Sequence, residues 1–208
     1  MRGICYARTR KMEPQKKYSF FEAGEVENKI AGTHTADPLG VLMVLAPNLW
    51  QDYSIVADTY AAEELLTAAD TYYKADAKIT DANIKVRALK RVRVWMDAVI
   101  VAFEWFEENI PDPSSRGLAE NQVLGDASHP LGTIVAYSGW LWHDTCKAIA
   151  NEIGTPLRES VDGYYAKDKA ITCKNAKIKA LKRIRIWLDV IIDAVAYIEE
   201  RTEPLFQS

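Results

Sequence analysis

The sequence has few of the features that mark secreted or membrane-spanning proteins. Its 208 residues include only three cysteines, Cys5, Cys146 and Cys173, an odd number without paired spacing. This argues against a disulfide framework and favours a reducing compartment. The longest apolar run, residues 94–103, is interrupted by Asp97 and is shorter than the roughly 20 residues that span a bilayer. We expect a cytoplasmic protein, or one within an assembled particle, with no membrane contact and no signal peptide.

Motifs for catalysis are also missing. No glycine-rich phosphate loop, activated serine, or inward carboxylate and histidine set of the di-iron bundle type is present. His34 and His129 fall in expected loops, where histidines are usually solvated. We therefore predict no catalytic residues, no metal and no cofactor, and a protein that is not an enzyme.

The sequence contains an internal repeat. Residues 38–110 align without a gap on residues 130–202 at a constant offset of 92, and 26 of the 73 aligned positions are identical. Shared motifs include Pro-Leu-Gly, Leu-Trp-x-Asp, Tyr-Tyr-x-x-Asp and Ala-Leu-Lys-Arg-x-Arg-x-Trp-x-Asp. The segment 24–32 recurs at 117–125 with an offset of 93. This spacing predicts one backbone plan for both copies.

Apolar residues predict a long helix at the end of each copy. They step by three and four residues, at Leu89, Val92, Met96, Val99, Phe103 and Phe106 and at Leu181, Ile184, Leu188, Ile191, Val195 and Ile198. We expect Thr80 and Thr172 to cap these helices, and Pro111 and Pro204 to mark their ends.

A second helical stretch precedes each long helix. Pro47 should bend it in the first copy, and Gly154-Thr155-Pro156 in the second. Each copy is then an antiparallel hairpin, and the predicted fold class is all-α, a four-helix bundle. We divide the chain into an N-terminal arm (1–23), repeat 1 (24–110), a linker (111–116), repeat 2 (117–203, in one bundle with repeat 1) and a tail (204–208).

Cations gather in the first half of each long helix, where the helix macrodipole disfavours them. The first helix carries Lys85, Arg87, Lys90, Arg91 and Arg93, and the second carries Lys174, Lys177, Lys179, Lys182, Arg183 and Arg185. In an up-down-up-down bundle the two long helices are parallel, so these charges meet at one end. Either carboxylates such as Asp70 and Asp76 neutralise them internally, or they contact nucleic acid or an acidic protein. Our candidate contacts are Lys90, Arg91, Arg93, Lys182, Arg183 and Arg185.

The N-terminal arm is the basic part of an acidic chain. Residues 1–23 carry six Lys or Arg against two Glu, a net charge of +4, which leaves −7 for the rest of a chain with net charge −3. Aromatic residues alternate with the cations, a composition that grips phosphates and stacks on bases or on a neighbour. We expect Arg8, Arg10, Lys16 and Lys17 to clamp another subunit or nucleic acid; packing on its own bundle is the third reading.

Aromatic residues and carboxylates recur in pairs in both copies. A buried Trp needs an acceptor for its indole N–H, and a nearby Asp can supply it, so core packing explains most of them. The functional alternative is a symmetric pair of small-molecule pockets, one per repeat. Their walls would be Trp50, Tyr72, Trp95, Trp142, Tyr164 and Trp187.

His143 and Cys146, three residues apart on an expected helix, are the only hint of a metal site. Gln51 and Ser54 occupy the matching places in the first copy, and zinc needs four ligands. We therefore do not predict a metal site there.

Two resemblances accompany these patterns. Arg93-Val94-Trp95-Met96 and Arg185-Ile186-Trp187-Leu188 look similar to a stretch of basic helical-bundle accessory proteins of retroelements. A helical bundle with an N-terminal arm resembles coat subunits of some filamentous viruses, in architecture only. We predict a non-enzymatic, self-assembling helical structural protein, a homo-oligomer or filament whose basic arm and basic helix ends contact neighbouring subunits or nucleic acid. The alternatives are a small-molecule binding module and a monomeric adaptor for an acidic protein.

Overall fold

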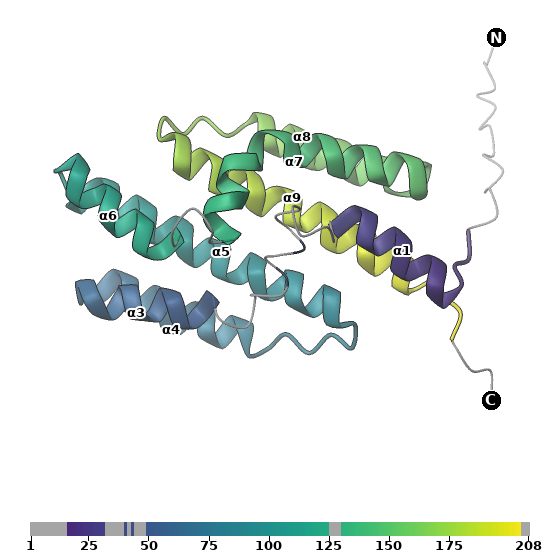
Figure 1. Cartoon of the computed structure of the whole chain (residues 1–208), viewed down its shortest axis with the longest axis horizontal. Coiled ribbons are helices and arrows are strands. Elements are labelled where there is room, and N and C mark those ends of the chain that lie inside the picture. Colours follow the sequence, from purple (N-terminus) through teal and green to yellow (C-terminus); the bar gives the residue numbers. More distant parts are fainter. Residues whose placement is uncertain (1–15, 32–39, 41–42, 44–48, 125–129, 205–208) are drawn as a thin grey trace, which may run out of the picture.

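The computed structural model describes residues 16–31, 40, 43, 49–124 and 130–204. This part of the chain is helical and contains no strand, only one isolated β-bridge, so the all-α prediction is confirmed. The helices are α1 (Phe20–Ala31), α3 (Leu49–Tyr60), α4 (Glu63–Asp76), α5 (Ile84–Asn109), α6 (Pro113–Leu124), α7 (Pro130–Glu152), the short 3-10 helix η2 (Thr155–Leu157), α8 (Arg158–Lys169) and α9 (Ala176–Glu199) (Figure 1). None of these helices combines the length and apolar character that a bilayer crossing requires.

The stretch ahead of the first long helix has a break that was not predicted. In the first copy the chain breaks at Ala61, whose φ of 45° is in the left-handed region, and α4 starts two residues later. In the second copy the expected break occurs at Gly154, with φ 75°. No glycine or proline marks the first break, so it could not be predicted from a local sequence signal. The expected bend at Pro47 lies outside the described residues.

The caps of the long helices differ from the predicted ones. Asn83 and Asn175, rather than Thr80 and Thr172, accept hydrogen bonds from the amides two and three residues later. Asparagine is at least as good an N-cap as threonine, and it lies closer to the first apolar residue of each helix. Pro111 follows the end of α5 as expected.

The segments that precede each copy are helices, α1 and α6. Asp112 caps α6 by accepting from the backbone amide of Ser115 at 2.8 Å, and Pro113 is its first residue, so α6 begins inside the stretch predicted as a linker. α1 packs on α9 and α7, whereas α6 packs on α5 and α3. The leading helix of each copy therefore lies against the long helix of the other copy.

α5 and α9 lie at the centre of the molecule and carry most of its core (Figure 1). Leu89, Trp95 and Phe103 on α5 are almost completely buried, as are Leu181 and Trp187 on α9. α4 packs on α5, and α8 packs on α9. The apolar positions read from the sequence thus form the core, as the helical spacing predicted.

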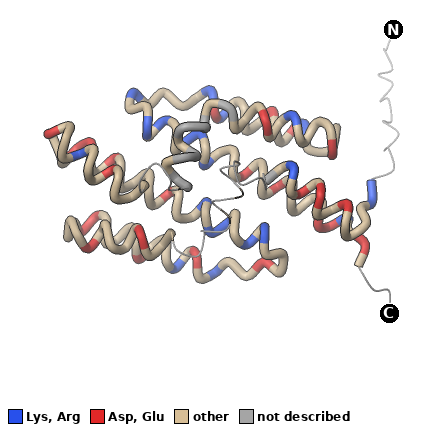
Figure 2. Tube along the Cα trace, in the orientation of Figure 1, with Lys and Arg blue, Asp and Glu red and all other residues tan. Residues whose placement is uncertain are grey.

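The two long helices are antiparallel, and the expectation that they point the same way was wrong (Figure 1). Arg93 of α5 pairs with Asp189, whereas Glu104, further along α5, pairs with Lys182, which comes earlier in α9. Residues later in α5 therefore pair with residues earlier in α9. The two helices run in opposite directions, and their first halves lie at opposite ends of the contact between them. Cations therefore do not accumulate at a common end through these two helices (Figure 2).

Candidate functional site

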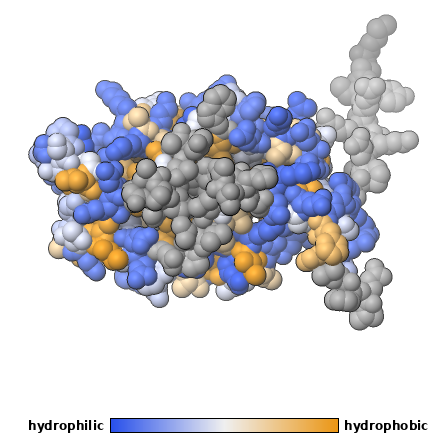
Figure 3. Space-filling view, in the orientation of Figure 1, coloured by the Kyte–Doolittle hydropathy of each residue, from blue (hydrophilic) through white to orange (hydrophobic). Residues whose placement is uncertain are grey.

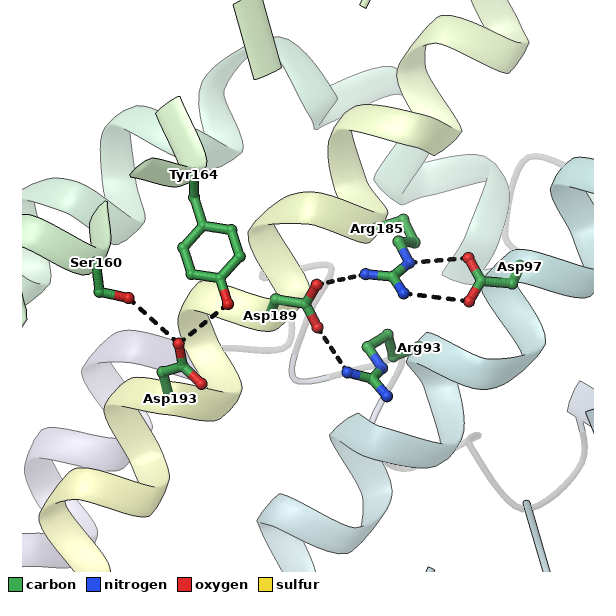
Figure 4. A network of polar contacts seen from close by, with 7 residues as sticks. All are labelled: Arg93, Asp97, Ser160, Tyr164, Arg185, Asp189 and Asp193. Atoms are coloured by element: carbon green, nitrogen blue, oxygen red, sulfur yellow. Dashed lines mark hydrogen bonds and ion pairs between the residues drawn. The ribbon is translucent and has the colours of Figure 1, made fainter. Parts of the chain in front are cut away.

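A charged seam joins α5 and α9 where they face each other (Figure 4). Arg93 donates to Asp189 at 2.8 Å, and Arg185 donates through Nε to Asp97 at 2.8 Å. Arg185 also contacts Asp189 within α9. At the offset of 92, Arg93 corresponds to Arg185 and Asp97 to Asp189, so the two interhelical pairs are reciprocal. The seam fixes the antiparallel register of the central helices.

The other four helix cations predicted to meet a polyanion also have carboxylate partners in the same chain. The pairs are Lys90 with Asp81 (2.5 Å), Arg91 with Asp76 (2.8 Å), Lys182 with Glu104 (2.6 Å) and Arg183 with Asp168 (2.7 Å). Arg91–Asp76 and Arg183–Asp168 are equivalent at the offset of 92. Internal neutralisation, one of the alternatives drawn from the sequence, thus accounts for all six predicted cations. Any external contact of these side chains stays a prediction.

The arm enters the described part of the molecule at one end. Tyr18 is buried and forms a parallel bridge with Thr202, with its amide 3.0 Å from the carbonyl oxygen of Arg201. Lys16 pairs with Glu22 at 2.8 Å, and Lys17 is exposed. Phe20 and Phe21 are also exposed. The other two predicted clamp residues, Arg8 and Arg10, lie outside the described residues.

The six predicted pocket residues lie in different surroundings in the described part of the chain. Trp95 and Trp187 are core residues, 1% and 0% exposed. The indole N–H of Trp187 donates to Asp168 at 3.3 Å, as the core-packing interpretation expects. Trp142 packs on Trp187 and on Tyr165, with ring centroids 6.5 and 5.4 Å apart.

Tyr164 instead belongs to a polar cluster beside the seam (Figure 4). Its hydroxyl donates to Asp193 at 3.2 Å, and Ser160 donates to the same carboxylate oxygen at 3.3 Å. Burial, and then the negative charge of Asp193, raise the pKa of Tyr164 to about 12. Burial also raises the pKa of Tyr72, helped by the charge of Asp97. The folded structure therefore favours the neutral form of the Tyr164 phenol.

Stability should consequently fall at alkaline pH. Above the ordinary tyrosine pKa of 10, the unfolded chain loses the Tyr164 proton first, so the free energy of unfolding decreases as the pH rises from 10 to about 12. We expect Tyr164→Phe to flatten this decrease, which urea titrations at successive pH values would measure. An unchanged slope in the variant would contradict the assignment.

A groove lies between α3 and α4 in the described part of the chain. It encloses about 640 Å³ and is lined by Trp50, Ser54, Ala57, Asp58, Leu66, Thr67, Ala69, Asp70, Thr71, Tyr73 and Lys74. Leu66 and Tyr73 are exposed large apolar side chains. Of the predicted pocket residues, Trp50 lines this groove. The tyrosine that lines the groove and contacts Trp50 is Tyr73, not the predicted Tyr72. We call it the α3–α4 groove.

The α3–α4 groove is acidic, and sequence reasoning missed it. Residues 49–76 carry six Asp or Glu and one Lys, a net charge of −5, whereas the equivalent residues 141–168 carry five acids and three bases, a net charge of −2. This difference between the copies was the available signal. A groove with acidic and aromatic walls suits a cationic, aromatic segment of chain.

A second hollow, of about 500 Å³, lies next to the α3–α4 groove and has the opposite character. Lys74, Lys78, Lys90 and Arg93 contribute to its lining. It contains two of the cations predicted to contact nucleic acid. Lys90 and Arg93 retain their carboxylate partners there.

His143 and Cys146 lie in different surroundings. His143 is exposed and makes an edge contact with the Trp142 ring, and burial raises the pKa of the Cys146 thiol. Within the described ranges, no three His, Cys, Asp or Glu side chains are grouped in a way that could hold a metal ion.

No protein-family model, curated protein or solved structure matches the chain.

Proposed function

We propose that this chain is a non-enzymatic, self-assembling helical structural protein, and that its basic arm contacts a neighbouring subunit. The observation that carries the proposal is how the positive charge is distributed. The six helix cations have carboxylate partners of their own chain. Residues 1–17 hold six Lys or Arg against one Glu, and they precede the anchor at Tyr18. The arm is thus the cationic segment best suited to bind another subunit.

We also infer an internally duplicated architecture, with α4–α5 and α8–α9 as the two hairpins of a four-helix bundle. The equivalent Arg91–Asp76 and Arg183–Asp168 pairs support this inference, as do the reciprocal pairs of the seam. A duplicated unit of this kind resembles a twofold dimer joined into one chain, because each pair on one side has its counterpart on the other.

Deleting residues 2–15 should abolish assembly without unfolding the helical core. The deletion removes four Lys or Arg and keeps Lys16, Glu22 and the Tyr18 bridge. Sedimentation equilibrium should find the full chain above its monomer mass of 23.4 kDa and the deletion variant at the mass of its monomer.

The control for this deletion is the unfolding transition, which circular dichroism should find unchanged. Equal association states for the full chain and the folded deletion variant would contradict the role of the arm.

The basic hollow beside α4 favours a second candidate function, contact with nucleic acid. Lys78 is exposed at its rim, and three further cations line it. A polyanion would have to compete with the internal carboxylates, so its binding should weaken steeply with salt. Absorbance at 260 nm of the purified particle tests this: excess signal that Lys78→Glu removes supports nucleic acid, and its absence in a large particle supports protein-only assembly.

A further inference from the structure

The second copy shows what covers its Tyr-Tyr motif. The ammonium group of Lys167 lies 4.7 Å from the ring centroid of Tyr164, and that of Lys169 lies 4.3 Å from the ring centroid of Tyr165. Both contacts fall within the range of cation–π attraction. The tyrosine pair of this copy is therefore covered by cations from its own helix, α8, one turn later.

The first copy has the same two tyrosines without these lysines. Ala75 and Ala77 stand at the positions that correspond to Lys167 and Lys169. Tyr73 is 53% exposed, and its ring makes an edge contact with Trp50 at 5.7 Å. The first copy thus has an open aromatic surface at the place where the second copy holds a lysine.

Two carboxylates lie in the same groove as this open surface. Asp58 and Asp70 both line the α3–α4 groove and are exposed. In the second copy Ala150 replaces the first of them, while Asp162 retains the second. Asp70 pairs with Lys74 at 2.9 Å, but both side chains are about 70% exposed, so this pair is weak and can be replaced. The groove therefore combines uncovered rings with accessible negative charge.

We propose that the α3–α4 groove binds the N-terminal arm of a second copy of this chain. A lysine or arginine of the arm lies over Tyr73, as Lys169 lies over Tyr165, and its neighbours face Asp58 and Asp70. This proposal rests on the proposed arm-mediated assembly and names the surface that receives the arm.

Charge and position identify this occupant. The arm carries +5 over residues 1–17, and residues 49–76 carry −5, or −4 without Asp76, which already pairs with Arg91. The fifteen residues before Lys16 can extend over roughly 50 Å, ample for reaching a neighbour. The start of α1 and the α3–α4 pair lie on opposite sides of the view in Figure 1. Exchange between copies therefore joins different surfaces of the two molecules, which can continue into a ring or a filament.

Sedimentation equilibrium of full-length variants tests the groove. We expect Asp58→Lys with Asp70→Lys to weaken self-association by about tenfold or more, because two attractive charges become repulsive. Asp162→Lys, the matched change in the second copy, should leave the association constant unchanged. Equal association of the double variant and the wild type would overturn the assignment.

Ala77→Lys provides a second, independent variant. It restores at Tyr73 the lysine that covers Tyr165, so the chain's own side chain should occupy the ring and weaken association several-fold. Lys169→Ala is its counterpart and should not weaken association. Stronger or unchanged association in Ala77→Lys would contradict the proposed contact over Tyr73.

The outcomes separate this inference from the proposed function. If deleting residues 2–15 leaves the association state unchanged, arm-mediated assembly fails and the groove proposal fails with it. If the deletion abolishes assembly while the groove variants associate normally, the arm binds elsewhere and only the groove assignment fails. Association that weakens with added salt supports both, because the contacts are exposed charges.

Discussion

Asp168→Ala should lower the free energy of unfolding by about 3–5 kcal/mol. Asp168 is 7% exposed and accepts from Arg183 at 2.7 and 3.1 Å and from the indole N–H of Trp187 at 3.3 Å. Its removal leaves a largely buried guanidinium and a fully buried indole without their acceptor, and each carries a desolvation cost. Urea denaturation followed by circular dichroism measures the loss.

The first copy offers a matched control. Asp76 forms the equivalent bidentate pair with Arg91, but Trp95 Nε1 has no hydrogen-bond partner among the described residues. Asp76→Ala should therefore cost about 1 kcal/mol less than Asp168→Ala, the net contribution of one hydrogen bond. A larger loss from Asp76→Ala would contradict this view of the two sites.

Reversing the charge of both arginines in the seam should unfold the chain or lower its free energy of unfolding by about 4 kcal/mol or more. Arg93→Asp with Arg185→Asp brings four carboxylates together between α5 and α9, with no charge to offset them. Adding Asp97→Arg and Asp189→Arg should restore most of the stability, because each pair is re-formed with opposite sign. Chemical denaturation of the double and quadruple variants measures both effects.

The rescue depends on the antiparallel register. The 2.8 Å interhelical pairs join each arginine to the aspartate of the other helix. Failure of the quadruple variant to recover any stability would mean that these pairs do not join the two helices.

The helices of each copy could be predicted from the sequence, because their apolar spacing is strong and repeated. The relation between the copies could not. A repeat specifies what each unit is, but the same unit can pair with its copy in a parallel or an antiparallel way. Arg93 and Asp97 lie four residues apart on α5, and the equivalent Arg185 and Asp189 lie four residues apart on α9. In the antiparallel arrangement Arg93 pairs with Asp189, and Arg185 pairs with Asp97. That reciprocity became visible only once α5 and α9 were placed together.

The candidate site was harder to predict than the core. The prediction from the sequence relied on residues that the two copies share, such as Trp50 and Tyr72. The α3–α4 groove instead depends on positions at which the two copies have different residues. Ala77 in place of lysine, and Asp58 in place of alanine, give the first copy its open acidic surface. Such differences have meaning only when the neighbouring helix and the exposure of Tyr73 are known.

Mixing two variants that assemble poorly alone tests the exchange of arms most directly. One variant lacks residues 2–15 but keeps the groove, and the other keeps the arm but carries Asp58→Lys and Asp70→Lys. At a concentration just above the wild-type dissociation constant, each should sediment mainly as a monomer by itself. An equimolar mixture should form a one-to-one complex, because the intact arm of one chain meets the intact groove of the other. A mixture that stays monomeric, while the wild-type chain assembles, would contradict the account.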